Sequence, residues 1–344
     1  MSEDQAQGSS RHERGRVTAT QVARLAGVSQ PTVSRTFNRP AMVSQATMRR
    51  VLAAAKELNY EPDAIAQSLA TRQTNIVGIV MADITSPFYP YVLEKFTSRL
   101  QEHGRQVLLF NAAHGQNVDN VLPLALRYRV DAIIITSASL SSEMADVCIK
   151  RDTPVILFNR YVKGVNAYGV CCDNVEGGRQ VADSFINAGY SRLAYIAGRE
   201  DTSTNIDRER GFGDRLCEVG LAGWRREQGQ YTYESGFRAT VRLMATDHPP
   251  EAIFCANDIM AMGAMDAARY ELGIKVPEEL AIVGFDDIPA ASWPSYSLTT
   301  IRQPVNRMIN VCLDLLGKSL ESPDWEPTLH LIPGEVIRRS SARV

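Results

Sequence analysis

From residue 75 onward, short apolar runs recur along the chain, and amphipathic stretches separate them. The runs are NIVGIVM, RQVLLFNA, DAIIITS, TPVILFN, RLAYIAG, EAIFCAN and ELAIVGF. Stretches between them, such as YPYVLEKFTSRLQEHG and EGGRQVADSFINAG, have the periodicity of helices. Near-continuous apolar strands that alternate with helices predict parallel sheets covered on both faces. More than about 200 residues of this pattern is too much for one compact sheet, so we expect two doubly wound lobes.

The first 62 residues have a different pattern, which predicts three short helices. We expect Thr20 to cap a helix through QVARLAG that ends at Gly27, where glycine tolerates positive φ. Ser29 caps a second helix, PTVSRTFN, whose first turn contains Pro31. Ser44 caps a third helix through ATMRRVLAAAKELN. The apolar stripe predicted for the third helix is Val51, Leu52, Ala55 and Leu58.

The first two helices have the spacing of a helix-turn-helix, whose second helix enters the major groove of DNA. Ala23, Gly27 and Val33 allow the two helices to cross closely. The alternative is a three-helix bundle that docks another protein. Charge favours DNA, because residues 1–60 contain nine Lys or Arg and four Asp or Glu, a formal charge of +5. The other 284 residues contain 28 bases and 35 acids, so the whole-chain charge of −2 hides a basic head on an acidic body.

The second helix supplies the candidate base contacts. Arg35 is the best candidate for a bidentate contact with guanine O6 and N7. Gln30 leads the helix and can reach a base edge, whereas Pro31 offers only apolar contact. Phosphate contacts set the register on DNA without reading its sequence. The candidates for phosphate and supporting DNA contacts are Thr18, Ser29, Thr32, Ser34 and Asn38.

Polar and aromatic residues follow several of the predicted strands, where ligands of open α/β sheets bind. These segments are Asp83 to Phe88, Asn159–Arg160, Asn257–Asp258 and Asp286–Asp287. Carboxylate and amide oxygens accept hydroxyl protons, a guanidinium donates as a fork, and a ring covers an apolar face, so the set suits a sugar-like polyol. Each residue also has a possible structural role. Asn257 and Asp286 could cap helices, Asp287 could belong to a turn, and Phe88 could pack on Pro87. A purine-like or phosphorylated ligand is the alternative, because Arg160 and Arg208 together can face an anion.

Several motifs, in their order and spacing, resemble the LacI/GalR family of bacterial transcriptional regulators. They are VTATQVARLAGVSQPTVSRTFNRPAMVS, NYEPDAIAQSLAT, NIVGIVMADITSPFY, NDIMAMGAM, VGFDDIP and LTTIRQP, and they span nearly all of the chain beyond residue 16. The resemblance implies a DNA-binding head, a hinge helix and a two-lobed periplasmic-binding-protein-like effector core that dimerises. The implied division is a disordered tail over 1–16, a head over 17–62 and a hinge helix with linker over 63–75. The first lobe would comprise 76–170 with 303–330, and the second 171–302 with 331–344.

The resemblance also implies roles for single residues. Residues 63–69 match the hinge helix, in which a leucine at the position of Leu69 wedges into the minor groove at the operator centre. Leu69 could instead pack on the core, and Asp63 stands where the family usually has asparagine. Arg208 of DRERGF corresponds to the effector clamp and Asp286 of GFDD to a hydroxyl-binding acid. The further effector contacts implied are Asn257, Asp83, Phe88, Asn159, Arg160 and Asp173.

Composition narrows the function. No run approaches the roughly 18 apolar residues of a membrane-spanning helix, and the opening MSEDQAQGSSRHERGR lacks the apolar segment of a secretory signal. Six cysteines without a CxxC pair predict buried thiols rather than a zinc site. GxSxG, HExxH and a strand-following GxGxxG are absent, so we expect no enzyme, cofactor or metal.

We therefore expect a cytoplasmic, homodimeric repressor that binds double-stranded operator DNA at the nucleoid and responds to a sugar-like effector. The alternatives are a cytosolic sugar-binding protein and a sugar-modifying enzyme, both without a role on DNA.

Overall fold

The structure is a computed structural model that describes residues 17–62, 73–82, 84–112, 118–136, 140–165, 167–321 and 326–344. Contacts divide the chain into two units, Met1–Thr74 and Asn75–Val344, and each is described by itself. The predicted tail over 1–16, the hinge residues 63–72 with Asp63 and Leu69, and the predicted ligand contact Asp83 lie outside the described residues.

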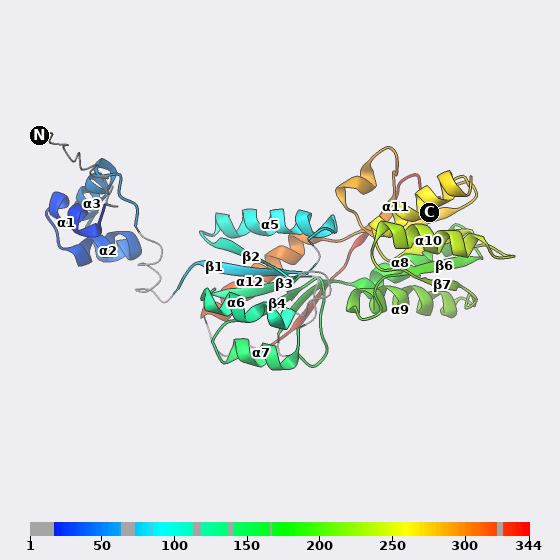
Figure 1. Ribbon diagram of the computed structural model, residues 1–344, viewed down its shortest axis with the longest axis horizontal. Helices are drawn as coiled ribbons and strands as arrows, with labels where there is room; N and C mark the ends of the chain where they lie inside the picture. The colour runs from blue at the N-terminus through cyan, green and yellow to red at the C-terminus, as the bar shows by residue number, and fades with distance from the viewer. Residues whose placement is uncertain are drawn as a thin grey trace, which may run out of the picture. The chain divides into compact units, whose positions relative to one another are not determined.

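The head is a bundle of three helices, α1 (Ala19–Ala26), α2 (Gln30–Asn38) and α3 (Gln45–Glu57), with a 3-10 turn η1 (Pro40–Met42) before α3 (Figure 1). Gly27 ends α1 with a φ of 62°, and Ser29 and Ser44 precede α2 and α3 as predicted. The predicted cap Thr20 is wrong by two residues. Thr18 is the N-cap, because its backbone amide donates to Oε1 of Gln21 at 2.8 Å, which fixes the start of the helix at Ala19.

One valine from each helix fills the centre of the head. Val22, Val33 and Val51 are at most 1% exposed. The stripe predicted for α3 is wrong at Leu52, which is 45% exposed, whereas Ala54 is buried. A helix advances about 100° per residue, so the neighbour of residue 51 on the same face lies three or four positions along, not one.

The first lobe of the core is a six-stranded parallel sheet in the order β11-β5-β4-β3-β1-β2. Its strands are β1 (Ile76–Met81), β2 (Gln106–Asn111), β3 (Ala132–Thr136), β4 (Val155–Phe158), β5 (Tyr168–Cys172) and β11 (Leu329–Ile332). The accompanying helices are α5 (Phe88–Glu102), η2 (Val118–Asn120), α6 (Leu122–Arg127), α7 (Ser142–Ile149) and α12 (Val305–Glu321). Figure 1 shows α5 on one face of the sheet and α6 and α7 on the other, so both faces are covered.

The second lobe has a sheet in the order β12-β10-β9-β8-β6-β7, parallel except for β12. Its strands are β6 (Leu193–Ala197), β7 (Arg225–Gln228), β8 (Ala252–Cys255), β9 (Ala281–Asp286), β10 (Thr299–Arg302) and β12 (Glu335–Ile337). The helical segments are α8 (Asn174–Asn187), α9 (Ser203–Glu218), α10 (Tyr233–Met244), α11 (Asp258–Asp266), η3 (Ala267–Glu271) and η4 (Pro289–Ser292). α8 packs beside α9, and α10 beside α11. The two doubly wound lobes predicted from the apolar runs are thus confirmed.

The chain passes between the two sheets after Cys172, after Arg302 and after Ile332. Cys171–Cys172 and Leu331–Ile332 had been expected in the second lobe. They pair with each other in the first sheet, because YGVCC is one continuous buried strand that ends at Cys172.

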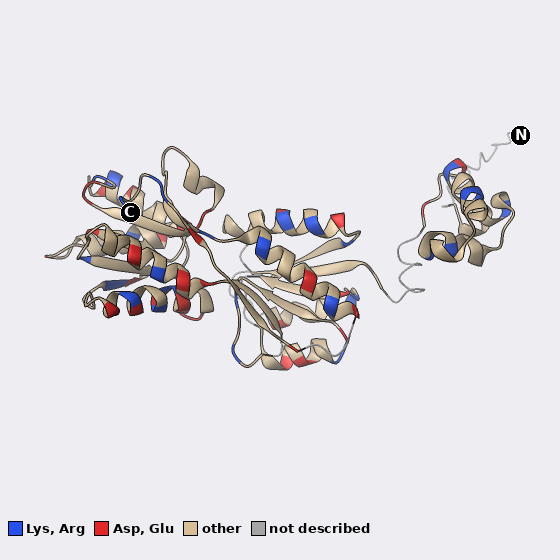
Figure 2. Cartoon of the chain, turned by 180° about the vertical axis from the view of Figure 1, so that it is seen from behind, with Lys and Arg blue, Asp and Glu red and all other residues tan. Residues whose placement is uncertain are grey.

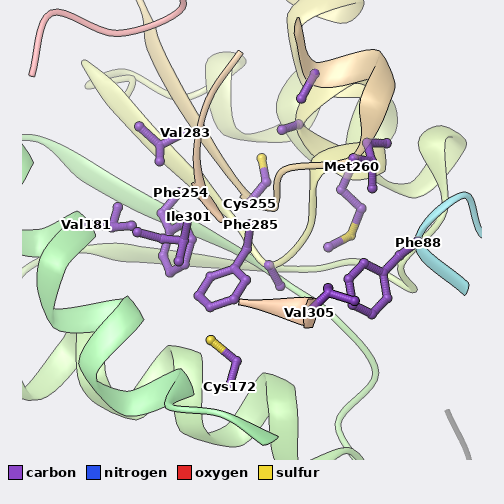
Figure 3. Close-up of a cluster of buried hydrophobic side chains, with 14 of the residues drawn as sticks. Phe88, Cys172, Val181, Phe254, Cys255, Met260, Val283, Phe285, Ile301 and Val305 are labelled. Atoms are coloured by element: carbon purple, nitrogen blue, oxygen red, sulfur yellow. The ribbon is translucent and has the colours of Figure 1, made fainter. Parts of the chain in front are cut away.

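A single cluster of buried apolar side chains extends through both lobes. Figure 3 shows part of it, with Cys172 of β5 and Phe88 of α5 among side chains of the second lobe such as Phe254 and Phe285. A separate cluster fills the face of the first sheet under α6 and α7. No helix in the described ranges is long and apolar enough to cross a membrane.

Candidate functional site

The candidate base-reading residues lie on the outer side of α2. Gln30, Pro31, Ser34 and Arg35 are exposed, whereas Val33 and Thr36 on the opposite side are buried. The guanidinium of Arg35 forms no hydrogen bond or ion pair with any described residue, so it is available to a partner. This is the exposure that a bidentate contact with guanine requires.

The predicted phosphate contacts form short hydrogen-bonded pairs along the same helices. The hydroxyls of Ser29 and Thr32 lie 2.9 Å apart, and Nδ2 of Asn38 donates to Oγ of Ser34 at 3.2 Å. Thr18 is exposed in front of α1. Each hydroxyl has further capacity to bond a phosphate, because it both donates and accepts.

The described part of the head carries an uncompensated positive charge. Its six basic residues are all exposed and form no ion pair within residues 17–62, and the same range holds two acids, Glu57 and Glu61. The basic residues are Arg24, Arg35, Arg39, Arg49, Arg50 and Lys56 (Figure 2). Such a surface attracts the phosphate backbone of DNA.

In the core, a pocket opens at the carboxyl ends of strands from both lobes. The residues that line it are Ser86, Phe88, Tyr89, Asn159, Arg160, Thr204, Arg208, Tyr231, Asn257 and Asp286. Six of the eight predicted effector contacts are among them; Asp173 is not, and Asp83 is not described. The cavity holds about 30 Å³, which is room for about two or three water molecules. We call this narrow cavity the inner pocket.

Arg208 is the most firmly held side chain of this inner pocket. It comes from the second turn of α9 and is 2% exposed. Its Nε donates to Oδ1 of Asn174 at 2.8 Å and its Nη1 donates to the carbonyl of Ala256 at 2.5 Å. Its Nη2 lies 3.4 Å from Oδ1 of Asp286, and its guanidinium stacks on the ring of Phe285. The fork is thus fixed before any ligand arrives.

Asp286 ends β9 and faces Arg208. Its Oδ1 also accepts a hydrogen bond of 2.8 Å from Nε2 of Gln303, on the segment that returns to the first lobe. Burial raises the pKa of Asp286 to about 6, although Arg208 and Gln303 oppose this shift. Burial also raises the pKa of the neighbouring Asp258, and the charge of Asp286 adds to that effect. One carboxylate therefore remains in the pocket to accept a hydroxyl proton near neutral pH.

Two adjacent residues carry buried atoms without a partner. Oδ1 of Asn159 and Nε of Arg160 are buried, and neither has a hydrogen-bond partner among the described residues. Leaving a buried acceptor or donor unpaired costs about 1–3 kcal/mol. Both residues line the pocket, so a ligand or ordered water that pairs with them would recover that free energy. No ion pair joins Arg160 to Asp173 or Asp286 within the described chain.

Some predicted residues have structural roles that the sequence left open. Oδ1 of Asn257 accepts the amide of Met260 and so caps α11, although Asn257 also lines the pocket. Asp173 caps α8 by accepting the amide of Glu176 at 3.0 Å, which explains its position outside the pocket. Asp287 lies between two arginines, 2.6 Å from Nε of Arg302 and 2.7 Å from Nη2 of Arg339.

Three lining residues lie outside every predicted segment: Tyr89, Thr204 and Tyr231. Ser86 lies within the predicted segment Asp83 to Phe88, although it was not named as a contact. The position of Thr204 in the pocket could have been predicted from the sequence, because Thr204 lies one helical turn before Arg208 on the same face of α9. Tyr89 directly follows the predicted Phe88. Tyr231 follows the polar strand β7 and had no such spacing to indicate it; its hydroxyl lies 3.0 Å from Oγ1 of Thr204.

None of the six cysteines lines the inner pocket. All six cysteines are free; Cys217 is exposed and the others are buried, and burial raises the pKa of the Cys148 thiol to about 11. In the described ranges, no three His, Cys, Asp or Glu side chains are grouped to hold a metal ion.

Comparison with known proteins matches both units. The model of the family described as "Bacterial regulatory proteins, lacI family" matches residues 18–63, and a model described as "Periplasmic binding protein-like domain" matches residues 182–342. The transcriptional regulator GalS of Salmonella typhimurium is 33% identical over 328 residues, which cover 94% of this chain and 96% of GalS. The regulator AscG of Escherichia coli is 32% identical over 94% of this chain and 98% of AscG.

Solved structures extend the match to the whole architecture. The lac repressor dimer bound to operator and the anti-inducer ONPF has a TM-score of 0.83 at 26% identity, over 95% of this chain and 99% of that one. A complex of the regulator CelR with cellobiose has a TM-score of 0.70 at 29% identity, over 95% and 100%. These relatives are transcriptional regulators and not enzymes. The helix-turn-helix head, the two-lobed core and the similarity over nearly the full chain lead to one conclusion: this protein belongs to the LacI family of bacterial regulatory proteins.

Proposed function

We propose that the chain is a ligand-responsive transcriptional repressor that binds a near-palindromic operator as a homodimer and acts in the cytoplasm. The observation that carries the proposal is the polar pocket lined by both lobes, in a chain whose other unit is a basic helix-turn-helix. A ligand that fills the pocket contacts both lobes at once, so its binding changes their arrangement. Coupling between ligand and DNA must then be reciprocal.

On DNA, each head places α2 in the major groove of one half-site. Arg35 and Gln30 read base edges, Pro31 makes apolar contact, and the hydroxyls of α2 hold phosphates. Leu69 of each hinge segment enters the minor groove at the operator centre and opens a base step. Two symmetric heads explain why the operator is expected to be nearly palindromic.

In the core, a sugar or a related polyol fits the inner pocket best. Asp286 accepts hydroxyl protons, Arg208 and Arg160 donate, and Asn159 offers its unpaired oxygen. Phe88 and Tyr89 provide apolar ring surface on the side of the first lobe. The CelR structure is a complex with cellobiose, and the lac repressor has been solved bound to ONPG in its repressed state, which agrees with this class of effector.

The experiment that tests the DNA role compares Arg35→Ala with Lys56→Ala, both exposed bases of the head. Arg35→Ala should weaken operator binding by about 1–3 kcal/mol and relax base preference at one position per half-site. Lys56→Ala should act equally on operator and random DNA. Unchanged relative affinity of Arg35→Ala for the two DNAs would refute the recognition role of α2.

A second experiment tests the ligand role. A thermal-shift screen of sugars and purines identifies compounds that raise the melting temperature of the full chain, because a ligand of the folded state stabilises it by mass action. A true effector must also change operator affinity. A compound that stabilises the core and leaves operator affinity unchanged would contradict the coupling.

A further inference from the structure

A second and larger cavity lies beside the inner pocket and shares Arg160 with it. This outer pocket measures about 280 Å³. One wall is the loop after β4, with Arg160, Tyr161 and Lys163, and the other wall is the first two turns of α9, from Thr202 to Arg210. Space that the narrow inner pocket lacks is therefore available directly next to it.

Hydrogen bonds of Tyr161 join the two walls. Its backbone amide donates to Oγ of Ser203 at 3.2 Å, and its hydroxyl donates to Oδ2 of Asp207 at 2.8 Å. Tyr161 belongs to the first lobe, whereas Ser203 and Asp207 belong to the second. A group bound in the outer pocket therefore contacts both lobes, as a group in the inner pocket does.

The charges that line the outer pocket leave a positive excess. Its two acids are already paired: Asp207 with Nη2 of Arg210 at 2.9 Å, and Asp201 with Nη2 of Arg199 at 2.8 Å. Neither Arg160 nor Lys163 forms an ion pair or hydrogen bond with a described residue, and Nε of Arg160 is buried without a partner. The N-terminus of α9, a helix of 16 residues, adds the positive end of its dipole.

We propose that the outer pocket binds an anionic substituent of the effector, a phosphate or a carboxylate, while its hydroxyl-bearing part occupies the inner pocket. The inference rests on the proposed regulatory function and narrows the effector to a charged sugar. Arg160 lies at the junction and donates to the group that links the two parts. Lys163 supplies a point charge from the rim, and the positive end of the α9 dipole favours an anion there.

The test uses the full chain and three salts at equal ionic strength: sodium phosphate, sodium acetate and sodium chloride. Phosphate or acetate should raise the melting temperature of the core above its value in chloride by about 2–4 °C, at a concentration tenfold above the dissociation constant. Lys163→Met should reduce this difference to the general effect of the salt, and Lys163→Arg should keep it in full. Lys150→Met, an equal charge change at an exposed residue that ends α7, should behave like the wild type.

The comparison between variants cancels the general stabilisation that phosphate gives to any folded protein. A shift with phosphate assigns the pocket to a phosphate ester, and a shift with acetate assigns it to a sugar acid. Equal melting temperatures in all three salts, or equal shifts in Lys163→Met and wild type, would overturn the proposal. Neither result affects operator binding by the heads, so failure of this inference is distinct from failure of the proposed function.

Discussion

The guanidinium carbon of Arg208 lies 3.6 Å from the centroid of the Phe285 ring. The ring belongs to the cluster of buried side chains that extends through both lobes. Stacking on it orients the guanidinium plane, and the bonds to Asn174, Ala256 and Asp286 use its donors on three sides. Arg208 is therefore both a component of the core and the floor of the pocket.

Replacing Arg208 by alanine should consequently reduce both stability and ligand response. The change leaves Asp286 without its charged partner inside the core, for which we expect a loss of about 3–5 kcal/mol in the free energy of unfolding. Urea titration of the full chain measures it. Arg238→Ala removes an exposed arginine whose partner Glu234 is also exposed, and should cost at most about 0.5 kcal/mol. An Arg208→Ala protein of wild-type stability that still released operator normally would contradict the clamp role.

The crossing of α8 and α9 sets the position of Arg208. A Cβ atom on Gly211 would overlap the backbone carbonyl of Val175, so the two helices approach with no space for a side chain. Gly211→Ala should push α9 away from α8. We expect the free energy of unfolding to fall by about 1–3 kcal/mol or more, and the ligand to bind more weakly. Gly223→Ala is the matched control, because its Cβ would meet nothing within 4 Å. Equal unfolding midpoints for the two variants would show that α8 and α9 can move apart at no cost in stability, which would contradict the prediction.

In the head, neighbouring residues of α3 should respond very differently to truncation. Val51→Ala removes fully buried atoms between the three helices and should cost about 2 kcal/mol in head stability. Leu52→Ala removes exposed atoms and should change it by less than about 0.5 kcal/mol. Hydrogen exchange of head amides in the full chain follows this unit separately from the core. A larger effect at Leu52 would reinstate the stripe predicted from sequence.

Hydrophobic pattern predicted most of the buried strands, although it missed β5, whose five residues YGVCC are all buried. Each of the seven apolar runs corresponds to a strand. Six of these strands are almost wholly buried, because helices cover both faces of the sheets, whereas the edge strand β2 has only Phe110 buried. β7 was missed because it is an edge strand of sequence RREQ with no fully buried residue. Tyr231, which follows β7, was missed with it.

Individual site residues were harder to predict, because a capping carboxylate and a ligand-binding carboxylate occupy the same kind of position. Asp173 and Asp286 both follow strands, yet Asp173 accepts the amide of Glu176 while Asp286 faces Arg208. Whether such a carboxylate caps a helix or binds a ligand depends on whether a helix begins at the next residue. After Asp173 a helix does begin, because α8 starts at Asn174. Spacing within one helix is a better guide to which residues line the pocket. Thr204 lies four positions before Arg208 on α9, so this spacing predicts that both face the same side.

The raised pKa of Asp286 predicts opposite effects of pH on stability and on ligand binding. The folded pKa of about 6 exceeds the ordinary value of 3.8, so burial favours the protonated carboxyl. This group's contribution to stability is therefore complete below about pH 4 and is lost as the pH rises through about 6. Asp286→Asn removes that contribution, so the stability difference between wild type and variant should shrink over the same interval.

Ligand affinity should change in the opposite direction. A neutral sugar serves here as a probe of the inner pocket alone. If its hydroxyl donates to Asp286 it needs the carboxylate, so its dissociation constant should rise as the pH falls from 7 to 5. Calorimetric titrations across this range, with a neutral sugar that the thermal-shift screen identifies, measure the effect. Asp286→Asn keeps an acceptor oxygen but does not titrate, and its weaker affinity should be independent of pH. Parallel pH profiles for the wild type and Asp286→Asn would exclude Asp286 as the acceptor and shift that role to Asn159, whose Oδ1 is unpaired.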